Sequence, residues 1–143
     1  MRRWTIFVFA GLALGSILTG CNKANQRAPY AEPHPVHGSV TFSNKTPLKG
    51  GMITFTPKDS KSGVGGQIYE VAGLVDAKGN YELTMPMYGD GAAIGVYQVK
   101  IEPREGEIPG SNSNKIPKQY TGYESPLEAT VVEGDNKIDF VLR

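Results

Sequence analysis

The sequence holds one cysteine, Cys21, at a position where its thiol could be chemically modified. An apolar stretch begins at Trp4 and ends in Leu18-Thr19-Gly20, directly before this cysteine. Arg2 and Arg3 precede the stretch, and a positive start followed by an apolar run is typical of a secretory signal. A plain signal peptide would end in an A-x-A-like site, whereas here the small residues converge on the cysteine. The sequence therefore predicts export, with Cys21 as the residue on which processing acts.

Leu18, Thr19, Gly20 and Cys21 together resemble a bacterial lipobox, the site at which a lipoprotein precursor is lipidated and then cut before the cysteine. The resemblance implies that residues 1–20 are a lipoprotein signal peptide. It also implies a diacylglyceryl thioether on Cys21 and an acylated amino group. One acyl chain binds a membrane marginally, whereas two or more anchor a protein stably. The membrane is therefore the first partner that we expect, reached through this N-terminal lipid.

A retained membrane-spanning helix is the alternative for this segment. Such a helix needs about 20 consecutive apolar residues to cross the hydrocarbon core of a bilayer. The stretch from Trp4 to Leu18 is shorter, and threonine, serine and glycine residues interrupt it. Its length and composition favour the cleaved signal.

Residues 21–35 show no hydrophobic period and end in a proline-rich run, so we expect the lipidated cysteine to be followed by a flexible tether. As a relaxed coil this tether would span roughly 20 Å, enough to hold a domain clear of the lipid head groups. Asn22 follows the cysteine, and analogy with enterobacterial sorting then favours the outer membrane. We expect a membrane-anchored lipoprotein that faces the periplasm or the cell surface.

The composition is that of one exported globular domain. Without Arg2 and Arg3, 13 of the 15 Lys and Arg residues stand against 14 Asp and Glu, which leaves a formal charge of −1. Such a balance provides no basic face, and we expect no nucleic acid partner. With 39% hydrophobic residues the chain can bury a core, and its 18 Gly and 10 Pro lie between short apolar runs. We therefore expect one domain at residues 36–143, built from short strands and tight turns.

Alternation of apolar and polar residues predicts the individual strands. The expected strands cover residues 36–42, 52–56, 67–75, 81–85, 96–101, 127–131 and 138–142. In the second of these we expect Thr54 on the polar face and an end at Pro57. Polar or glycine-rich loops are expected at 58–66 and 88–94. A tight turn is expected at 76–80, where Gly79 can adopt a positive φ.

The last two predicted strands should form a terminal hairpin through residues 133–136. No segment shows an apolar period of 3.6 residues, so we expect the mature chain to be all-β. Each strand has one apolar and one polar face, as two antiparallel sheets packed on one core require. About seven strands therefore predict a single antiparallel two-sheet sandwich, transthyretin-like or immunoglobulin-like.

Four motifs resemble the carboxypeptidase regulatory-like (transthyretin-like) domain. They are Gly38–Phe42, Pro47–Phe55, Asp76–Leu83 and Gly95–Ile101. The mature chain is also similar to small lipoproteins abundant in planctomycete-type bacteria, which share Gly89-Asp90-Gly91-Ala92, Ile116-Pro117-x-x-Tyr120 and Asn136-x-x-Asp139-Phe140-x-Leu142. The resemblance implies an accessory sandwich domain, mostly without chemistry of its own.

The residue types that catalyse reactions or bind metals form no complete set in the sequence. His34 and His37 lie three residues apart, but even a catalytic zinc site uses three protein ligands. The turn at 76–80 lacks the alternating Asp and Asn ligands of an EF-hand loop, and Asp90 is expected to be a turn residue. No Gly-x-Ser-x-Gly motif is present. We expect no catalytic residue, no metal and no cofactor.

Residues 103–126 form a longer connection than a sandwich needs, and such stretches are usually functional or disordered. The first part, residues 104–114, is expected to be mobile. In the second part, either Ile116 and Tyr120 hold the connection on the sandwich, or the segment forms a contact surface. For the contact-surface alternative, the residues expected to touch an envelope protein or polysaccharide are Tyr88, Lys118 and Tyr123.

Together these observations predict a lipid-anchored cell-envelope lipoprotein that acts as a non-catalytic structural or binding module. Two alternatives stay open. One is a hydrolase of envelope material that would use the loop carboxylates of Glu105, Glu107 and Glu124. The other is a spacer subunit within a larger envelope complex.

Overall fold

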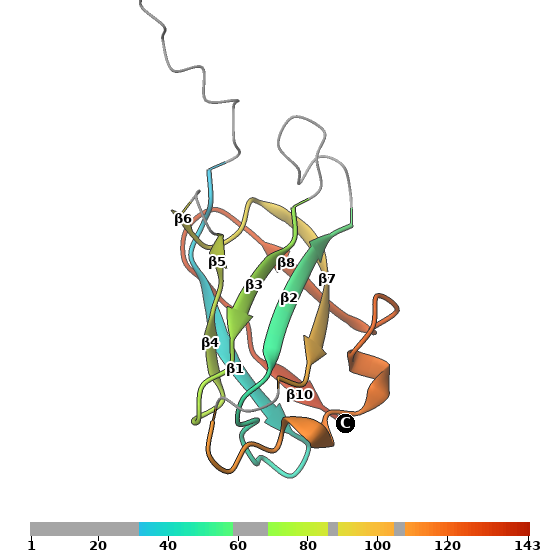
Figure 1. Ribbon diagram of the computed structural model, residues 1–143. Helices are drawn as coiled ribbons and strands as arrows, with labels where there is room; N and C mark the ends of the chain where they lie inside the picture. The colour runs from blue at the N-terminus through green and yellow to red at the C-terminus, as the bar shows by residue number, and fades with distance from the viewer. Residues whose placement is uncertain (1–31, 59–68, 86–88, 105–107) are drawn as a thin grey trace, which may run out of the picture.

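The computed structural model describes residues 32–58, 69–85, 89–104 and 108–143. In these ranges the chain is almost entirely strand, with two short 3-10 helices (Figure 1). None of the helices in the described ranges has the length and apolar character needed to cross a bilayer. The predicted all-β class is confirmed. The expected signal peptide, most of the tether and most of the loop at 58–66 lie outside the described residues.

Ten strands are assigned within the described ranges, against about seven predicted. They are β1 (Val36–Phe42), β2 (Met52–Pro57), β3 (Val71–Leu74), β4 (Asn80–Glu82), β5 (Thr84–Met85), β6 (Gly89–Asp90), β7 (Gly95–Glu102), β8 (Leu127–Val131), β9 (Asn136–Lys137) and β10 (Phe140–Leu142). The 3-10 helices are η2 (Ser113–Lys115) and η3 (Lys118–Tyr120).

The strands form two sheets that pack face to face (Figure 1). The larger sheet has the order β6-β5-β3-β2-β7-β8, and its pairs are antiparallel. The smaller sheet has the order β10-β1-β4, and β9 also pairs with β1. β9 and β10 run parallel to β1. The predicted sandwich is confirmed, but its wholly antiparallel form is wrong, because the end of the chain runs beside its own first strand in the same direction.

The predicted terminal hairpin is wrong as well. β8 pairs with β7 at the edge of the larger sheet, where Ala129 stands opposite Tyr97. β10 pairs with β1 in the smaller sheet, where Phe140 stands opposite Val40. Residues 132–135 therefore cross from one sheet to the other. A hairpin and such a crossing have the same local pattern, because both join two alternating runs through a short polar segment.

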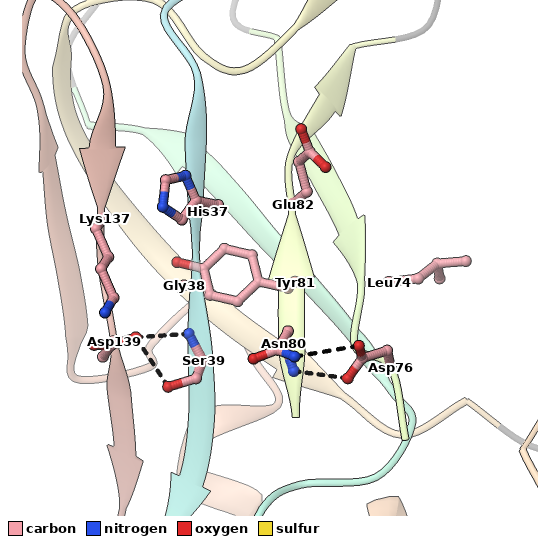
Figure 2. A pocket seen from close by; sticks show the side chains of 10 residues that line it. All are labelled: His37, Gly38, Ser39, Leu74, Asp76, Asn80, Tyr81, Glu82, Lys137 and Asp139. Carbon is pink, nitrogen blue, oxygen red and sulfur yellow. Dashed lines mark hydrogen bonds between the residues drawn. The ribbon is translucent and has the colours of Figure 1, made fainter. Parts of the chain in front are cut away.

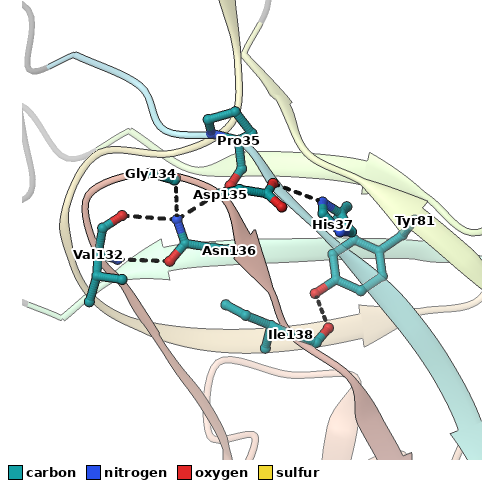
Figure 3. Close-up of polar contacts among 8 residues, drawn as sticks. All are labelled: Pro35, His37, Tyr81, Val132, Gly134, Asp135, Asn136 and Ile138. Atoms are coloured by element: carbon teal, nitrogen blue, oxygen red, sulfur yellow. Dashed lines mark hydrogen bonds and ion pairs between the residues drawn. The ribbon is translucent and has the colours of Figure 1, made fainter.

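Buried Asn136 holds this crossing in place (Figure 3). Its amide group donates to the backbone oxygens of Val132, Gly134 and Pro35, at 2.9, 2.9 and 3.3 Å. Its Oδ1 accepts a hydrogen bond from the N–H of Val132 at 2.9 Å. One side chain thus satisfies backbone groups that leave the sheet ladder at this point.

The strand predicted at 81–85 is divided between the two sheets. β4 pairs with β1, whereas β5 pairs with β3. Fully buried Leu83 lies at the change of sheet. Gly73 on β3 permits the close approach of the chain at Glu82, since a Cβ at Gly73 would overlap the carbonyl oxygen of Glu82.

Other strand ends differ by a few residues from the prediction. The strand expected at 67–75 is β3, and β2 continues through Pro57, which pairs with Tyr97. The loop expected at 88–94 contains β6. The turn at 76–80 is confirmed, and Gly79 has a φ of +87°.

The core lies between the sheets and consists of the inward residues of both. The ring of Phe55 in the larger sheet contacts those of Tyr81, Tyr97 and Phe140, at centroid distances of 6.3, 5.9 and 6.1 Å. Tilted and edge-on contacts at these distances are favourable for aromatic rings.

Thr54 departs from the expected polar face: it is 3% exposed, and its hydroxyl has no hydrogen-bond partner among the described residues.

The long connection after β7 packs on the sandwich. Ile116 and Tyr120 are buried, which confirms the first of the two predictions for this segment. The described residues 108–114, where mobility was expected, carry hydrogen bonds to the backbone of Pro47 and Lys49. Asn112 accepts a hydrogen bond from the N–H of Lys49 at 2.7 Å and donates one to the carbonyl of Pro47 at 3.1 Å. Asn112 and Ser111 thus bind backbone groups of the segment between β1 and β2.

Candidate functional site

The candidate site is a groove on the outer face of the smaller sheet, with a cavity volume of about 520 Å³ (Figure 2). Most of the residues that line it are polar, and they come from neighbouring strands and the turn at 76–80. The residues that line it are His37, Gly38, Ser39, Leu74, Asp76, Asn80, Tyr81, Glu82, Lys137 and Asp139.

Strand alternation brings these side chains together. In β1 the buried residues Val36 and Val40 alternate with His37 and Ser39, which face outward. Pairing places His37 opposite both Glu82 and Lys137, so three strands contribute one row of polar groups. Groups opposite each other on one face lie close enough to act on the same ligand.

Ser39 and Asp139 are joined by two hydrogen bonds within the groove. Asp139 Oδ1 accepts hydrogen bonds from the backbone N–H and the hydroxyl of Ser39, at 2.7 and 2.9 Å. The bond from the Ser39 hydroxyl lowers the pKa of Asp139, and the Ser39 N–H and the charge of Lys137 act in the same direction against partial burial. Asp139 is therefore an ionised acceptor with a fixed orientation.

Asp76 is a second oriented carboxylate at the other side of the groove. Its Oδ1 accepts hydrogen bonds from the N–H groups of Lys78 and Asn80, at 2.7 and 2.8 Å. Burial alone would raise the pKa of Asp76, but these hydrogen bonds lower it overall. The tight turn predicted from the sequence thus also supplies a negative charge to the groove.

Tyr81, whose ring belongs to the core, also borders the groove. Its hydroxyl donates a hydrogen bond of 2.7 Å to the carbonyl of Ile138 (Figure 3). Burial, together with the negative charge of Asp139, raises the pKa of this phenol, which stays protonated. Gly38 makes room for the contact, because a Cβ there would overlap the same carbonyl.

Serine, histidine and aspartate all occur in the groove, the residue types of a hydrolytic triad. A triad requires the histidine to accept the proton of the serine hydroxyl. Here the Ser39 hydroxyl donates to Asp139, while His37 Nδ1 lies 3.3 Å from Asp135 Oδ1. The hydrogen bonds among these described residues orient polar groups toward solvent and form no nucleophile–base pair.

Of the residues predicted for the anchor, for partner contact or for hydrolysis, some lie outside the described part of the chain and the others lie outside the groove. Leu18, Thr19, Gly20, Cys21 and Tyr88 lie outside the described residues. Lys118 is exposed on η3, and Tyr123 is 65% exposed, but neither lines the groove. Glu124 is exposed, whereas Glu105 and Glu107 lie outside the described residues.

Tyr123 lies instead beside the outer face of the larger sheet. The ammonium of Lys100 is 4.2 Å from the centre of its ring and 3.3 Å from the carboxylate of Glu102. Partial burial would lower the pKa of Lys100, but Glu102 raises it overall. This contact holds the exposed end of the long connection against β7.

The two histidines are held in separate contacts. His34 Nδ1 accepts a hydrogen bond from the N–H of Gly134 at 3.1 Å, and the His34 backbone pairs with Ala92. His34 and Pro35, the last residues of the predicted tether, thus already bond to the fold. Within the ranges that the structure describes, no three His, Cys, Asp or Glu residues gather in a geometry that could hold a metal ion.

Sequence reasoning missed the groove. Alternation places Glu82 on an outward strand face, and Asp139 belongs to the motif Asn136-x-x-Asp139-Phe140-x-Leu142. Neither observation shows which residues of other strands lie beside Glu82 or Asp139. The pairing of β1 with β4 and β9 creates the site, and no local pattern encodes that pairing.

Comparison of the chain with protein-family models, with curated proteins and with solved structures found no match.

Proposed function

We propose that this protein is a lipid-anchored lipoprotein of the bacterial cell envelope whose sandwich acts as a non-catalytic binding module. The anchor is proposed from the lipobox-like Leu18–Cys21 pattern and the tether that follows it. The outer-membrane location and the carboxypeptidase regulatory-like type of the sandwich belong to the same proposal. Binding is carried by one observation, the groove of oriented polar groups on the smaller sheet.

The chemistry of the groove favours an envelope polysaccharide as the ligand. Asp139, Asp76 and Glu82 offer acceptors, while Lys137 and Asn80 offer donors. The cores of protein–protein interfaces are rich in aromatic and apolar groups and poor in Lys, Glu, Asp and Ser, which is the reverse of this composition. Sugar hydroxyl groups both donate and accept hydrogen bonds. They can therefore pair with the carboxylates and with the amino and amide groups of the groove, so that no charged group is left without a partner on binding.

A paired substitution tests the groove. Glu82→Gln together with Lys137→Ala should weaken the binding of purified envelope polysaccharide at least about ten-fold, because each lost charged hydrogen bond is worth 1.5–3 kcal/mol by general estimates. The matched control is Glu128→Gln with Lys115→Ala, two exposed positions outside the groove. Isothermal titration on glycan fractions measures both variants.

Two results would redirect the binding part of this proposal. Equal binding by the groove variant and its control would contradict the groove as the site. Loss of binding with Tyr123→Ala alone would assign the contact to the surface predicted from the sequence. Intact-mass analysis of membrane-extracted protein tests the anchor separately, since it must show an acylated Cys21 at the N-terminus.

A further inference from the structure

Exposed aliphatic side chains of the larger sheet gather at one end of the sandwich. Ile94, Val96 and Val132 are 54%, 38% and 55% exposed. Gly95 pairs with Val131 at the ends of β7 and β8, so Ile94 and Val132 extend from adjacent strand ends. These three residues are called the end patch below.

The end patch lies where the chain enters the fold. Ile94 lines one shallow pocket together with Glu32, His34 and Glu133. Glu32 is the first described residue. In Figure 1 the chain enters at the end of the sandwich where β7 begins, and the C-terminus lies at the opposite end. The patch and the point where the tether joins the domain therefore share one end of the molecule.

Ten residues separate Cys21 from Glu32. Fully extended they reach at most about 36 Å, and as a relaxed coil they span about 17 Å. A lipid on Cys21 would hold the end patch close to the bilayer, at an effective concentration in about the millimolar range. At such a concentration even a weak contact is populated for much of the time.

We infer that the end patch docks on the bilayer that holds the lipid of Cys21, an inference that rests on the proposed anchor. Aliphatic side chains of peripheral proteins enter the boundary between head groups and acyl chains. The carboxylates of Glu32 and Glu133, both exposed beside Ile94, suit the ammonium groups of zwitterionic head groups and would be repelled by anionic lipid. The docked domain turns its C-terminal end away from the membrane.

A depth measurement on the processed full chain tests the docking. The protein is placed in phosphatidylcholine vesicles with an environment-sensitive fluorophore on Val132→Cys. The control label is on Val141→Cys, because Val141 is 48% exposed and belongs to β10, next to the C-terminus at the opposite end. Nitroxide-bearing lipid should quench the label at position 132 at least three-fold more strongly than the label at 141. Ile94→Asp, or replacement of half of the lipid by an anionic one, should reduce this difference.

Each other result is informative. Equal quenching at the two positions, in a chain whose intact mass shows an acylated Cys21, overturns the docking and leaves the anchor standing. A chain without lipid on Cys21 overturns both. A third result is a label at position 132 that reports an apolar environment only at high protein concentration and loses it when the protein is diluted at constant lipid. That result would mean that the patch binds a second copy of the chain, and it would also overturn the docking. Ile94→Cys gives a second label position, should Val132→Cys fail to fold.

Discussion

Single residues fix both the shape and the charge of the groove. Ser39 gives two hydrogen bonds to Asp139, and these bonds lower the pKa of the carboxyl group. A carboxyl group with a lowered pKa stabilises the fold at pH values above the pKa of the unfolded chain, about 3.9 for aspartate. This stabilisation is lost as the pH falls from there through the pKa of the folded state.

Asp139→Asn should therefore flatten the acid limb of the stability curve. The free energy of unfolding of the unmodified protein should fall more steeply below about pH 4 than that of the variant. The difference should be less than about 1 kcal/mol, because Asp139 is exposed to solvent. Urea titrations between pH 6 and 2.5 measure it. Asp90→Asn, an exposed aspartate outside the groove, is the control, and an equal flattening in that variant would contradict the role of Ser39.

Elements of this fold approach each other closely where a glycine removes a side chain. Gly73 on β3 faces the carbonyl of Glu82, where the chain passes from the smaller to the larger sheet. Gly38 on β1 faces the carbonyl of Ile138, between β9 and β10. Both contacts involve backbone oxygens, which cannot yield as a flexible side chain could.

Gly73→Ala should destabilise the protein by about 3 kcal/mol, since the new methyl group would overlap a backbone atom in a packed region. Gly122→Ala is the matched control, because a Cβ there meets no atom within 4 Å. Thermal unfolding followed by circular dichroism compares the two variants. A Gly73→Ala protein as stable as Gly122→Ala would show that β3 and β4 do not approach as described.

At the scale of the whole molecule, one aromatic cluster joins the two sheets. Phe55 of the larger sheet contacts Tyr81 and Phe140 of the smaller one as well as Tyr97 of its own sheet. The chain also crosses between the sheets at Leu83 and again at residues 132–135. Because both sheets share this core and these crossings, neither should unfold alone.

Phe55→Ala should lower the free energy of unfolding by about 3–5 kcal/mol, the usual cost of removing a buried ring. Phe42→Ala, at a partly buried phenylalanine on the margin of the core, should cost clearly less. Amide hydrogen exchange should show β1 and β7 losing protection together in the Phe55 variant. Loss of protection in one sheet only would contradict a shared core.

Several features of the protein could be predicted from the sequence because they depend on near neighbours in the chain. Period-two alternation predicted most strands and their buried faces, including Val36, Val40, Ile53 and Ile101. Turn chemistry predicted the bend at 76–80, where Gly79 has a positive φ. The lipobox-like pattern before Cys21 is equally local, and it stays a prediction because residues 1–31 lie outside the described part of the chain.

The tertiary structure alone decided which strands become neighbours. Alternation is the same whether β8 pairs with β7 or with β10, so the sequence pattern could not separate a terminal hairpin from a crossing between sheets. It could not show that residues 81–85 divide between the sheets, or that Asn112 bonds to Lys49. The groove depends on the same long-range pairing, since its polar row exists only where β4 and β9 flank β1. Local chemistry thus determined the elements and their faces, and contacts between distant segments determined the site.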